Sequence, residues 1–465
     1  MDDLGLPAGA AWRRHARTGG TVALLFLLTL AGCLTQEPEP LFRPAPEGFA
    51  ALAQDIAKFR NLSFKRAIAL APGFFENAFG NDSTGPLRLN YVEEAYKRIG
   101  LLPHDANLAA ALAAFSRLEV LFSYDSAQAA VTIAPAAAKL GAPFKVSDPT
   151  LAREAPLGFA VVAALQEQNF HWQDKLRTAF LEDQRLALRA LATGDAVVTL
   201  IARTVNRTDL TSADLALGER FAAELEKTAV RLPAFLREQI PFRYREGSRF
   251  VLWALKTRGW PGVDALYDKP PVSTAVLLHP EKYFVAGEQP LRFYPAALLR
   301  RAADGILVEQ SLGEQLVRSL LAPSAEPRSV NEIAAQWRGD QLFAFQDDTE
   351  TVTAWYSAWA SPAHALTFLR AYRAVLERRQ GIRFSSASEP SMPNALSGRM
   401  RDQRGAWLAA QGTVVLFLSG ISPKRLRDRV QDAWRDLEID VDSTAIRFDS
   451  VRLRKKPAYE SLSKW

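Results

Sequence analysis

Cysteine and histidine are both scarce in this sequence. Cys33 is the only cysteine among 465 residues, and the chain has five histidines. A single thiol excludes an intrachain disulfide and a zinc site built from cysteines. After residue 33, no histidine has a second histidine three or four residues away, the spacing at which two imidazoles on one helix face bind zinc. We therefore expect no metal ligands and no bound cofactor.

Other common signatures are absent as well. The net charge is +6, but the basic residues are spread out and form no cluster interleaved with aromatic residues, so we expect no nucleic-acid partner. The sequence contains no G-x-S-x-G motif, no phosphate-binding glycine loop, no internal repeat and no recognisable pair of glycosidase carboxylates. These absences argue against α/β-type hydrolases, nucleotide-binding enzymes and glycosidases.

What the sequence does contain begins with a basic and then apolar N-terminus. Arg13, Arg14 and Arg17 precede an apolar run at residues 21–30, which is too short to span a bilayer comfortably. The following Leu30-Ala31-Gly32-Cys33 resembles the lipobox of bacterial lipoproteins, in which the thiol is acylated and becomes the new N-terminus. A signal anchor with an incidental cysteine is the alternative.

The lipobox resemblance implies where the mature protein resides. Residues 1–33 would be a signal peptide with its lipobox, and the acyl chains on Cys33, palmitate among them, would hold the protein to membrane lipid. We expect a location in the bacterial cell envelope, on the periplasmic or outer-membrane side. Removal of residues 1–32 takes away three Arg and two Asp, which changes the net charge from +6 to +5. Residues 34–48 are rich in proline and predict an extended tether.

Beyond the tether, the apolar patterning predicts an α+β fold that is predominantly helical, with small β-sheets. We divide it into residues 49–290, a helical domain with a β-hairpin, and residues 291–465, a C-terminal α+β region. Helices are expected at residues 49–59, 92–99, 107–121, 157–170, 181–191, 212–231, 297–321, 363–379 and 423–437, and strands at 120–124, 129–133, 341–346, 351–358, 412–418 and 446–451.

The helix at residues 157–170 is the stretch that carries most information. Phe159 and Ala163 are four residues apart and share one face of it, and Ala160 lies on the adjacent strip. On periodicity alone it is a buried core helix.

A more specific interpretation comes from the residues that follow. Residues 164–170, Ala-Leu-Gln-Glu-Gln-Asn-Phe, resemble the end of H-E-x-x-H-A-L-x-D-Q-x-F, the metal-binding helix of a family of bacterial secreted and lipoprotein zincin-type metallopeptidases. In this register Phe159 and Ala163 replace the two histidines, and Ala160 replaces the glutamate. The sequence Phe159-Ala160-Val161-Val162-Ala163 thus occupies the place of the motif without its functional groups.

A second segment of this family supplies the third zinc ligand and has the pattern A-L-x-E-G-D-A. Residues 190–196 resemble it, with Thr193 in place of the glutamate. Zinc binding requires imidazole, thiolate or carboxylate ligands, and peptide hydrolysis requires a base for the metal-bound water. The resemblance therefore implies a zincin-like body whose catalytic site has been lost. It extends in islands over residues 50–420, including residues 60–66, 267–274, 278–283 and 337–340.

The predicted hairpin at residues 120–133 offers a candidate peptide-binding edge. In zincins an extended substrate adds to an edge strand near the metal helix, and Val120, Phe122 and Tyr124 lie on the corresponding strand. A purely structural hairpin is the alternative that we favour. His171, just after the key helix, is the candidate for a rebuilt metal site, although it has no histidine near it in sequence.

Three functions follow from these observations. The first is a catalytically inactive metallopeptidase homologue that binds a peptide or protein partner. The second is a hydrolase or glycan-binding protein with another site. The third is a structural lipoprotein without a cleft. Candidate residues for the second are Glu167, Asp195, Glu246, Trp253, Trp260, Trp337, Trp355 and Trp359, although ten tryptophans in a chain of this size are more often core residues.

Overall fold

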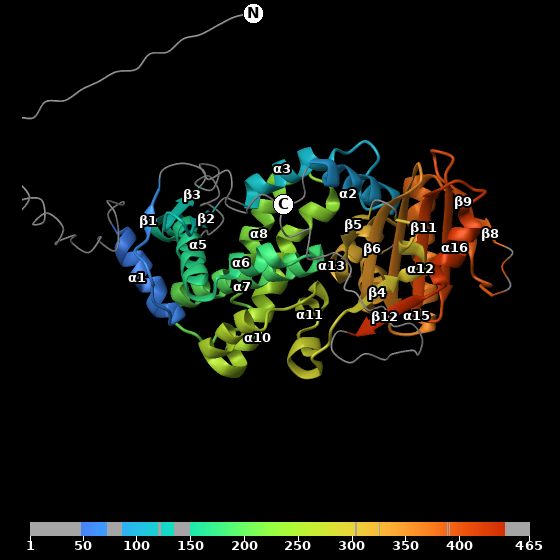
Figure 1. Ribbon diagram of the computed structural model, residues 1–465. Coiled ribbons are helices and arrows are strands. Elements are labelled where there is room, and N and C mark those ends of the chain that lie inside the picture. The colour runs from blue at the N-terminus through green and yellow to red at the C-terminus, as the bar shows by residue number, and fades with distance from the viewer. Residues whose placement is uncertain are drawn as a thin grey trace, which may run out of the picture.

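The computed structural model describes residues 48–71, 86–119, 122–133, 149–302, 305–324, 326–387, 389 and 391–441. Figure 1 shows a helical body beside a layer of long β-strands that comes from the C-terminal part of the chain. Helices predominate, and three sheets are present in the described ranges. The protein is thus a mixed helix-and-sheet protein, as predicted. Residues 1–33, with Cys33, and most of the tether lie outside the described residues.

A small sheet lies near the N-terminal end of the described chain. Strands β2 (Phe122–Asp125) and β3 (Ala130–Ile133) form the predicted hairpin. β3 also pairs in parallel with β1 (Ala69–Leu70), so β2 is an edge strand of this sheet. Helix α5 (Pro149–Phe170) contacts both strands of the hairpin. The other helices of this region are α1 (Phe49–Arg60), α2 (Pro86–Arg98) and α3 (Leu108–Glu119).

Helices α7 (Glu182–Val205) and α10 (Gln239–Asp268) form the centre of the helical body. A Cβ atom on Gly194 would lie 2.2 Å from the Gly247 backbone, and one on Gly247 would lie 2.1 Å from the Ala190 carbonyl oxygen. Only glycine permits so close an approach of two helix backbones. The remaining helices of the body are α6 (Trp172–Thr178), α8 (Ala216–Thr228), α9 (Ala234–Arg237), α11 (Thr274–Leu278) and a single π-helical turn at Lys282–Ala286.

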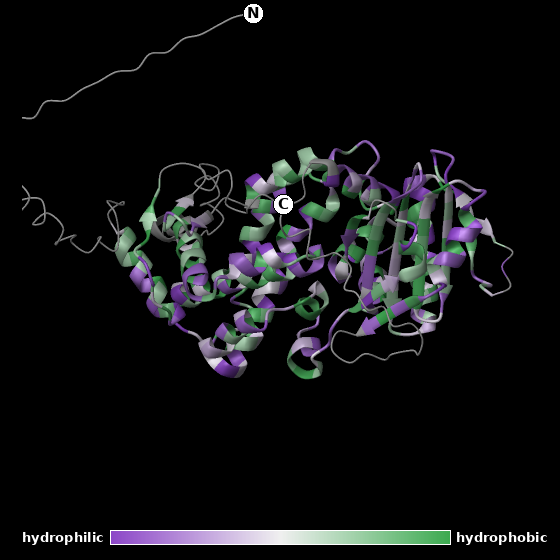
Figure 2. Cartoon of the chain, viewed as in Figure 1, coloured by the Kyte–Doolittle hydropathy of each residue, from purple (hydrophilic) through white to green (hydrophobic). Residues whose placement is uncertain are grey.

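The C-terminal layer is a seven-stranded antiparallel sheet in the order β5-β6-β7-β11-β10-β9-β8. Side chains alternate between its two faces, and both faces are buried. Figure 2 shows hydrophobic residues along the central strands. The strands are β5 (Ile306–Gln310), β6 (Trp337–Asp347), β7 (Glu350–Trp359), β8 (Ser385–Ser386), β9 (Leu396–Arg399), β10 (Gly405–Gln411) and β11 (Val414–Ile421).

Helices cover the two faces of this sheet. On one face Trp355 packs edge-on against Phe368 and Tyr372 of α15 (Pro362–Gln380). On the other, the Tyr356 hydroxyl donates to the Ala433 carbonyl of α16 (Leu426–Trp434) over 2.9 Å. A two-stranded sheet of β4 (Leu291–Pro295) and β12 (Leu437–Val441) lies nearby, as do α12 (Ala296–Leu299), α13 (Gly313–Leu321), a 3-10 turn (Ala322–Ser324) and α14 (Pro327–Ala334).

Helix α2 packs against the C-terminal sheet, although it lies early in the sequence. It contacts β5 and β6, and the segment at its end receives hydrogen bonds from α15. The Tyr372 hydroxyl donates to the Ile99 carbonyl over 3.0 Å, and Gln380 Nε2 donates to the Lys97 carbonyl over 2.6 Å. One apolar core therefore extends from the helical body to the α15 face of the sheet.

The structure corrects two of the predicted features. The predicted helix at residues 297–321 is interrupted by strand β5, because only its two ends are helical, in α12 and α13. The C-terminal sheet is also larger than the small sheets that we expected. The predicted strand at residues 446–451 lies outside the described residues. Within the described ranges, no helix combines the length and apolar character needed to cross a bilayer.

Candidate functional site

The residues that the resemblance aligns with zinc ligands lie at one pocket. Phe159 and Ala163 of α5 and Thr193 of α7 all line a pocket of about 90 Å³. Ala160, which the resemblance aligns with the catalytic glutamate, is completely buried and does not line this pocket. Three positions from two helices thus line one pocket, although Ala163 and Thr193 are 30 residues apart in the chain.

Aromatic packing fills the side of the pocket where the first histidine would stand. The Phe159 side chain is 6% exposed, and its ring stacks on Phe221 with 5.3 Å between centroids. Tyr244 of α10 meets the same ring edge-on, with 5.9 Å between centroids. Such aromatic pairs add about 0.5–1.5 kcal/mol each beyond the burial of apolar area. Phe159 is therefore part of the core that holds α5, α8 and α10 together.

The polar residues around this pocket are of kinds that do not hold zinc. Gln166 Nε2 donates to the Ala192 carbonyl over 2.9 Å, and Arg189 Nη1 lies 3.3 Å from Glu182 Oε1. The Arg243 guanidinium lies over the Phe115 ring, 5.5 Å from its centroid. None of the described lining residues is His, Cys, Asp or Glu. In the described part of the chain no group of three or more such residues is placed to hold a metal ion, and His171, exposed at the start of α6, belongs to no such group.

Directly behind the pocket, Asp195 is the centre of a buried polar network. Arg60 Nε lies 2.8 Å from Asp195 Oδ1, and the Tyr267 hydroxyl donates to Oδ2 over 2.9 Å. Gln166 Nε2 donates to the same Oδ2 over 3.2 Å. The Arg60 guanidinium also lies 2.7 Å from Asp264 Oδ1 and 4.6 Å from the centroid of the Trp260 ring. Burial alone would lower the pKa of Arg60, but the carboxylates of Asp195 and Asp264 raise it overall.

This network explains what several of the family-like residues do. Arg60, Gln166, Asp195 and Tyr267 come from four of the sequence islands, and all of them meet in this one buried cluster. Asp195 was a candidate for catalysis by another mechanism, but its carboxylate is completely buried and bonded on both oxygens. Its role in the fold is structural, since it neutralises Arg60 and joins α1, α5, α7 and α10.

The candidate peptide edge is only partly described. Val120 lies outside the described residues, as does the side chain of Phe122. Tyr124 is 2% exposed, and its hydroxyl accepts a hydrogen bond from Gln168 Nε2 over 2.9 Å. Its carbonyl accepts a bond from Gln173 Nε2 over 3.2 Å. Strand β2 is an edge strand as the hypothesis requires, but its Tyr124 side chain faces inward and one backbone acceptor is already bonded.

The other candidates for an alternative site do not converge with Asp195. The Glu167 carboxylate accepts from the Gln173 backbone N–H over 2.9 Å, and burial raises its pKa. Glu246 pairs with Arg249 over 3.2 Å. None of these carboxylates lines the pocket beside Phe159. Four of the five tryptophans proposed for glycan binding are at most 8% exposed, and only Trp253 is substantially exposed.

Two further islands also form buried contacts. His279 Nε2 lies 2.9 Å from Glu314 Oε1, so this histidine is bonded to a buried carboxylate. Asp340 Oδ1 accepts from the Gly313 backbone N–H over 2.9 Å, and Oδ2 accepts from Trp355 Nε1 over 2.9 Å. Burial raises the pKa of Asp340, and these hydrogen bonds oppose the shift.

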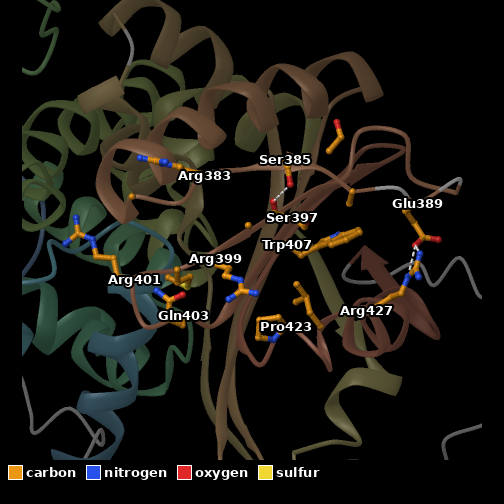
Figure 3. Close-up of a pocket in the computed structure, with 16 residues that line it drawn as sticks. Arg383, Ser385, Glu389, Ser397, Arg399, Arg401, Gln403, Trp407, Pro423 and Arg427 are labelled. Atoms are coloured by element: carbon orange, nitrogen blue, oxygen red, sulfur yellow. Dashed lines mark hydrogen bonds and ion pairs between the residues drawn. The ribbon is translucent and has the colours of Figure 1, made fainter.

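Sequence reasoning missed a larger pocket in the C-terminal sheet. Its volume is about 800 Å³, and it lies between the β8–β9–β10 edge and the start of α16. Figure 3 shows Trp407 across its centre, with Arg399 on one side and the Glu389–Arg427 pair on the other. The available signal was the density of arginines at residues 383–404, but these positions have no fixed spacing that identifies a site.

Comparisons with known proteins give one match. Residues 301–429 match a family described as Domain of unknown function (DUF8575). This segment contains all seven strands of the large sheet and the pocket around Trp407. No curated protein and no solved structure matches the chain.

Proposed function

We propose that this protein is a lipid-anchored component of the bacterial cell envelope that descends from zincin-type metallopeptidases and acts by binding rather than by cleaving peptides. The observation that carries the proposal is the convergence of Phe159, Ala163 and Thr193 on one pocket. A sequence register that was wrong by one residue would turn these α5 positions by about 100°.

The chemistry of the three side chains supports the loss of peptidase activity. A phenyl ring and a methyl group offer zinc no ligand, and a hydroxyl alone is not among its usual ligands. The position of the general base holds the methyl group of a completely buried alanine. Buried imidazoles and carboxylates are costly when they are unpaired, so their joint replacement by apolar groups also favours the folded state.

The binding role rests on the surroundings of the pocket. The helical body around it is held together by buried contacts, including the Asp195 network and the Gly194–Gly247 contact. Strand β2 still lies at an edge of its sheet and against α5. A partner with an extended segment is the kind of ligand that such an edge accepts.

The decisive experiment measures metal and proteolysis in one sample. The mature protein is purified from envelope membranes, its zinc content is determined by mass spectrometry, and a peptide library is incubated with it. We expect far less than one zinc per chain and no chelator-sensitive cleavage. About one zinc per chain together with cleavage that a chelator abolishes would overturn the proposal.

The anchoring part has its own test. In cells, Cys33→Ser removes the acylation site, so the protein should leave the detergent-soluble membrane fraction and lose incorporation of labelled palmitate. Unchanged palmitate incorporation in this variant would contradict acylation at Cys33. Affinity capture of the acylated protein after crosslinking in the envelope then identifies the partner. The same capture with a variant substituted in strand β2 shows whether the partner binds at this edge.

A further inference from the structure

The large pocket of the C-terminal sheet is lined by apolar residues and by arginines. Trp407, Met400, Pro423 and Leu426 supply apolar lining, and Ser385 and Ser397 add hydroxyl groups to it. Its volume of about 800 Å³ falls in the range of small-molecule sites. The space is large enough for a ligand that has both a polar head and an apolar part.

The charged residues around the pocket are mostly of one sign. The lining includes four arginines and one glutamate. The glutamate, Glu389, pairs with Arg427 over 3.2 Å. Arg399 is exposed and has no ion pair with any residue that the structure describes. In Figure 3 its side chain extends toward Trp407 and Pro423, whereas Arg383 and Arg401 extend away from the centre.

A second polar group at this pocket lacks a partner. Trp407 is 5% exposed, and its Nε1 atom is buried without a hydrogen-bond acceptor among the described residues. Buried polar groups in folded proteins are nearly always satisfied, because an unmade hydrogen bond costs about 1–3 kcal/mol. Because this N–H is buried, a ligand acceptor in the pocket would reach it only if binding also moved the side chains that cover it.

We propose that this pocket binds an amphiphilic anion, that is, a small molecule with a carboxylate or phosphate head and an apolar part. The Arg399 guanidinium anchors the head, because its planar donors match carboxylate and phosphate oxygens. The indole N–H of Trp407 donates a further hydrogen bond, and the apolar part lies on Met400 and Leu426. This inference does not depend on the proposed loss of peptidase activity at the pocket beside Phe159.

Titration calorimetry on the full chain tests the proposal with defined probes. Octanoate represents a free carboxylate, dihexanoyl phosphatidylglycerol represents a lipid phosphate, and inorganic phosphate lacks the apolar part. Dihexanoyl phosphatidylcholine is the zwitterionic comparison. We expect saturable binding of octanoate or of the phosphatidylglycerol, and weaker binding of inorganic phosphate. Preference between the first two probes assigns the natural head group to a carboxylate or to a lipid phosphate.

Three substitutions locate the binding. Arg399→Ala should weaken the affinity at least about tenfold, since it removes a charge-assisted contact, and Arg399→Lys should restore part of the loss. Trp407→Phe keeps an aromatic ring but removes the N–H and part of the apolar surface of the indole, and should weaken the affinity several-fold while the protein stays folded. Arg328→Ala, at an exposed arginine outside the pocket, is the control and should bind as the wild type does. Equal binding by Arg399→Ala and wild type, or no saturable binding of any anionic probe, would overturn the proposal.

Discussion

Arg60 and Asp195 form a completely buried ion pair, with Arg60 Nε 2.8 Å from Asp195 Oδ1. The two residues are 135 positions apart in the chain, so the pair joins the end of α1 to the middle of α7. The Tyr267 hydroxyl and the Gln166 amide also donate to this carboxylate. Because each of these four groups has a buried partner, a single substitution in this cluster should strongly reduce the free energy of unfolding.

Asp195→Ala should destabilise the protein by about 3–5 kcal/mol, since it leaves the Arg60 guanidinium buried without its main counterion. Urea denaturation followed by circular dichroism measures this loss. In a double-mutant cycle, Arg60→Leu combined with Asp195→Leu should cost less than the sum of the single changes.

The control is an exposed ion pair of similar geometry. Arg328 Nε lies 3.0 Å from Glu332 Oε1, and their side chains are 92% and 66% exposed. Arg328→Ala should change stability by less than about 0.5 kcal/mol. A loss below 1 kcal/mol for Asp195→Ala would contradict the role that we assign to the buried pair.

Gly194→Ala should destabilise the protein by about 1–3 kcal/mol. The added Cβ would lie 2.2 Å from the Gly247 backbone, so α7 and α10 must separate. This cost outweighs the gain in helix propensity of about 1 kcal/mol. Gly158→Ala is the matched control, because its Cβ would meet only the end of the Leu200 side chain. Thermal unfolding should show a lower Tm for the first variant only, and equal Tm values would refute the close contact.

Asp183 should make the stability depend on pH between about 4 and 7. Burial raises its pKa to about 7 from 3.8, although hydrogen bonds from Thr274 lower it. Between these values the folded state keeps the proton and the unfolded state has lost it, so this group's contribution to stability falls as pH rises. Asp183→Asn removes this dependence while keeping an acceptor for Thr274.

The difference in unfolding free energy between Asp183→Asn and wild type isolates this effect from other titrating groups. This difference should shift in favour of the variant between pH 4.5 and pH 7.5. The shift should be about 1.4 kcal/mol for each pH unit that lies between the unfolded and the folded pKa of Asp183. Denaturant curves at both pH values provide the measurement. A difference that stays constant across this range would show that Asp183 has an ordinary pKa.

Restoring the family motif should create a zinc site. The variant carries Phe159→His, Ala160→Glu, Ala163→His and Thr193→Glu. Without metal it should be less stable than wild type, because unpaired polar groups are buried and the Phe159 stack is lost. Zinc should raise its Tm, since a ligand that binds only the folded state stabilises it, and should leave the wild-type Tm unchanged. A variant lacking only Thr193→Glu should respond more weakly, and no response in the full variant would disprove the register.

Short-range patterns predicted much of this fold, and long-range contacts account for what they missed. The helix at residues 157–170 and the hairpin strands were predicted from periodicity and are present in α5, β2 and β3. Strand β5 was expected to be helical because its five residues are too few to show a decisive period, although the turn signal Asp304-Gly305 directly precedes it. Its conformation is instead fixed by pairing with β6.

The candidate sites likewise combine features that short-range patterns indicated with features that depend on long-range contacts. Residues 159, 163 and 193, which the resemblance assigns to the zinc ligands, line one pocket. The structural role of Asp195 was not foreseen, because its partner Arg60 lies 135 residues away. The residues that line the pocket around Trp407 come from three strands and the start of a helix, so no local pattern in the sequence marks it.

Because α2 packs against the large sheet, the C-terminal segment is not expected to fold stably when it is separated from α2. Residues 301–429 contain the seven strands but lack α2, whose end receives the hydrogen bonds of Tyr372 and Gln380. A fragment cut at those limits would present an uncovered side of the sheet to water and should aggregate. On its own, this segment would leave the donors of Tyr372 and Gln380 without these acceptors.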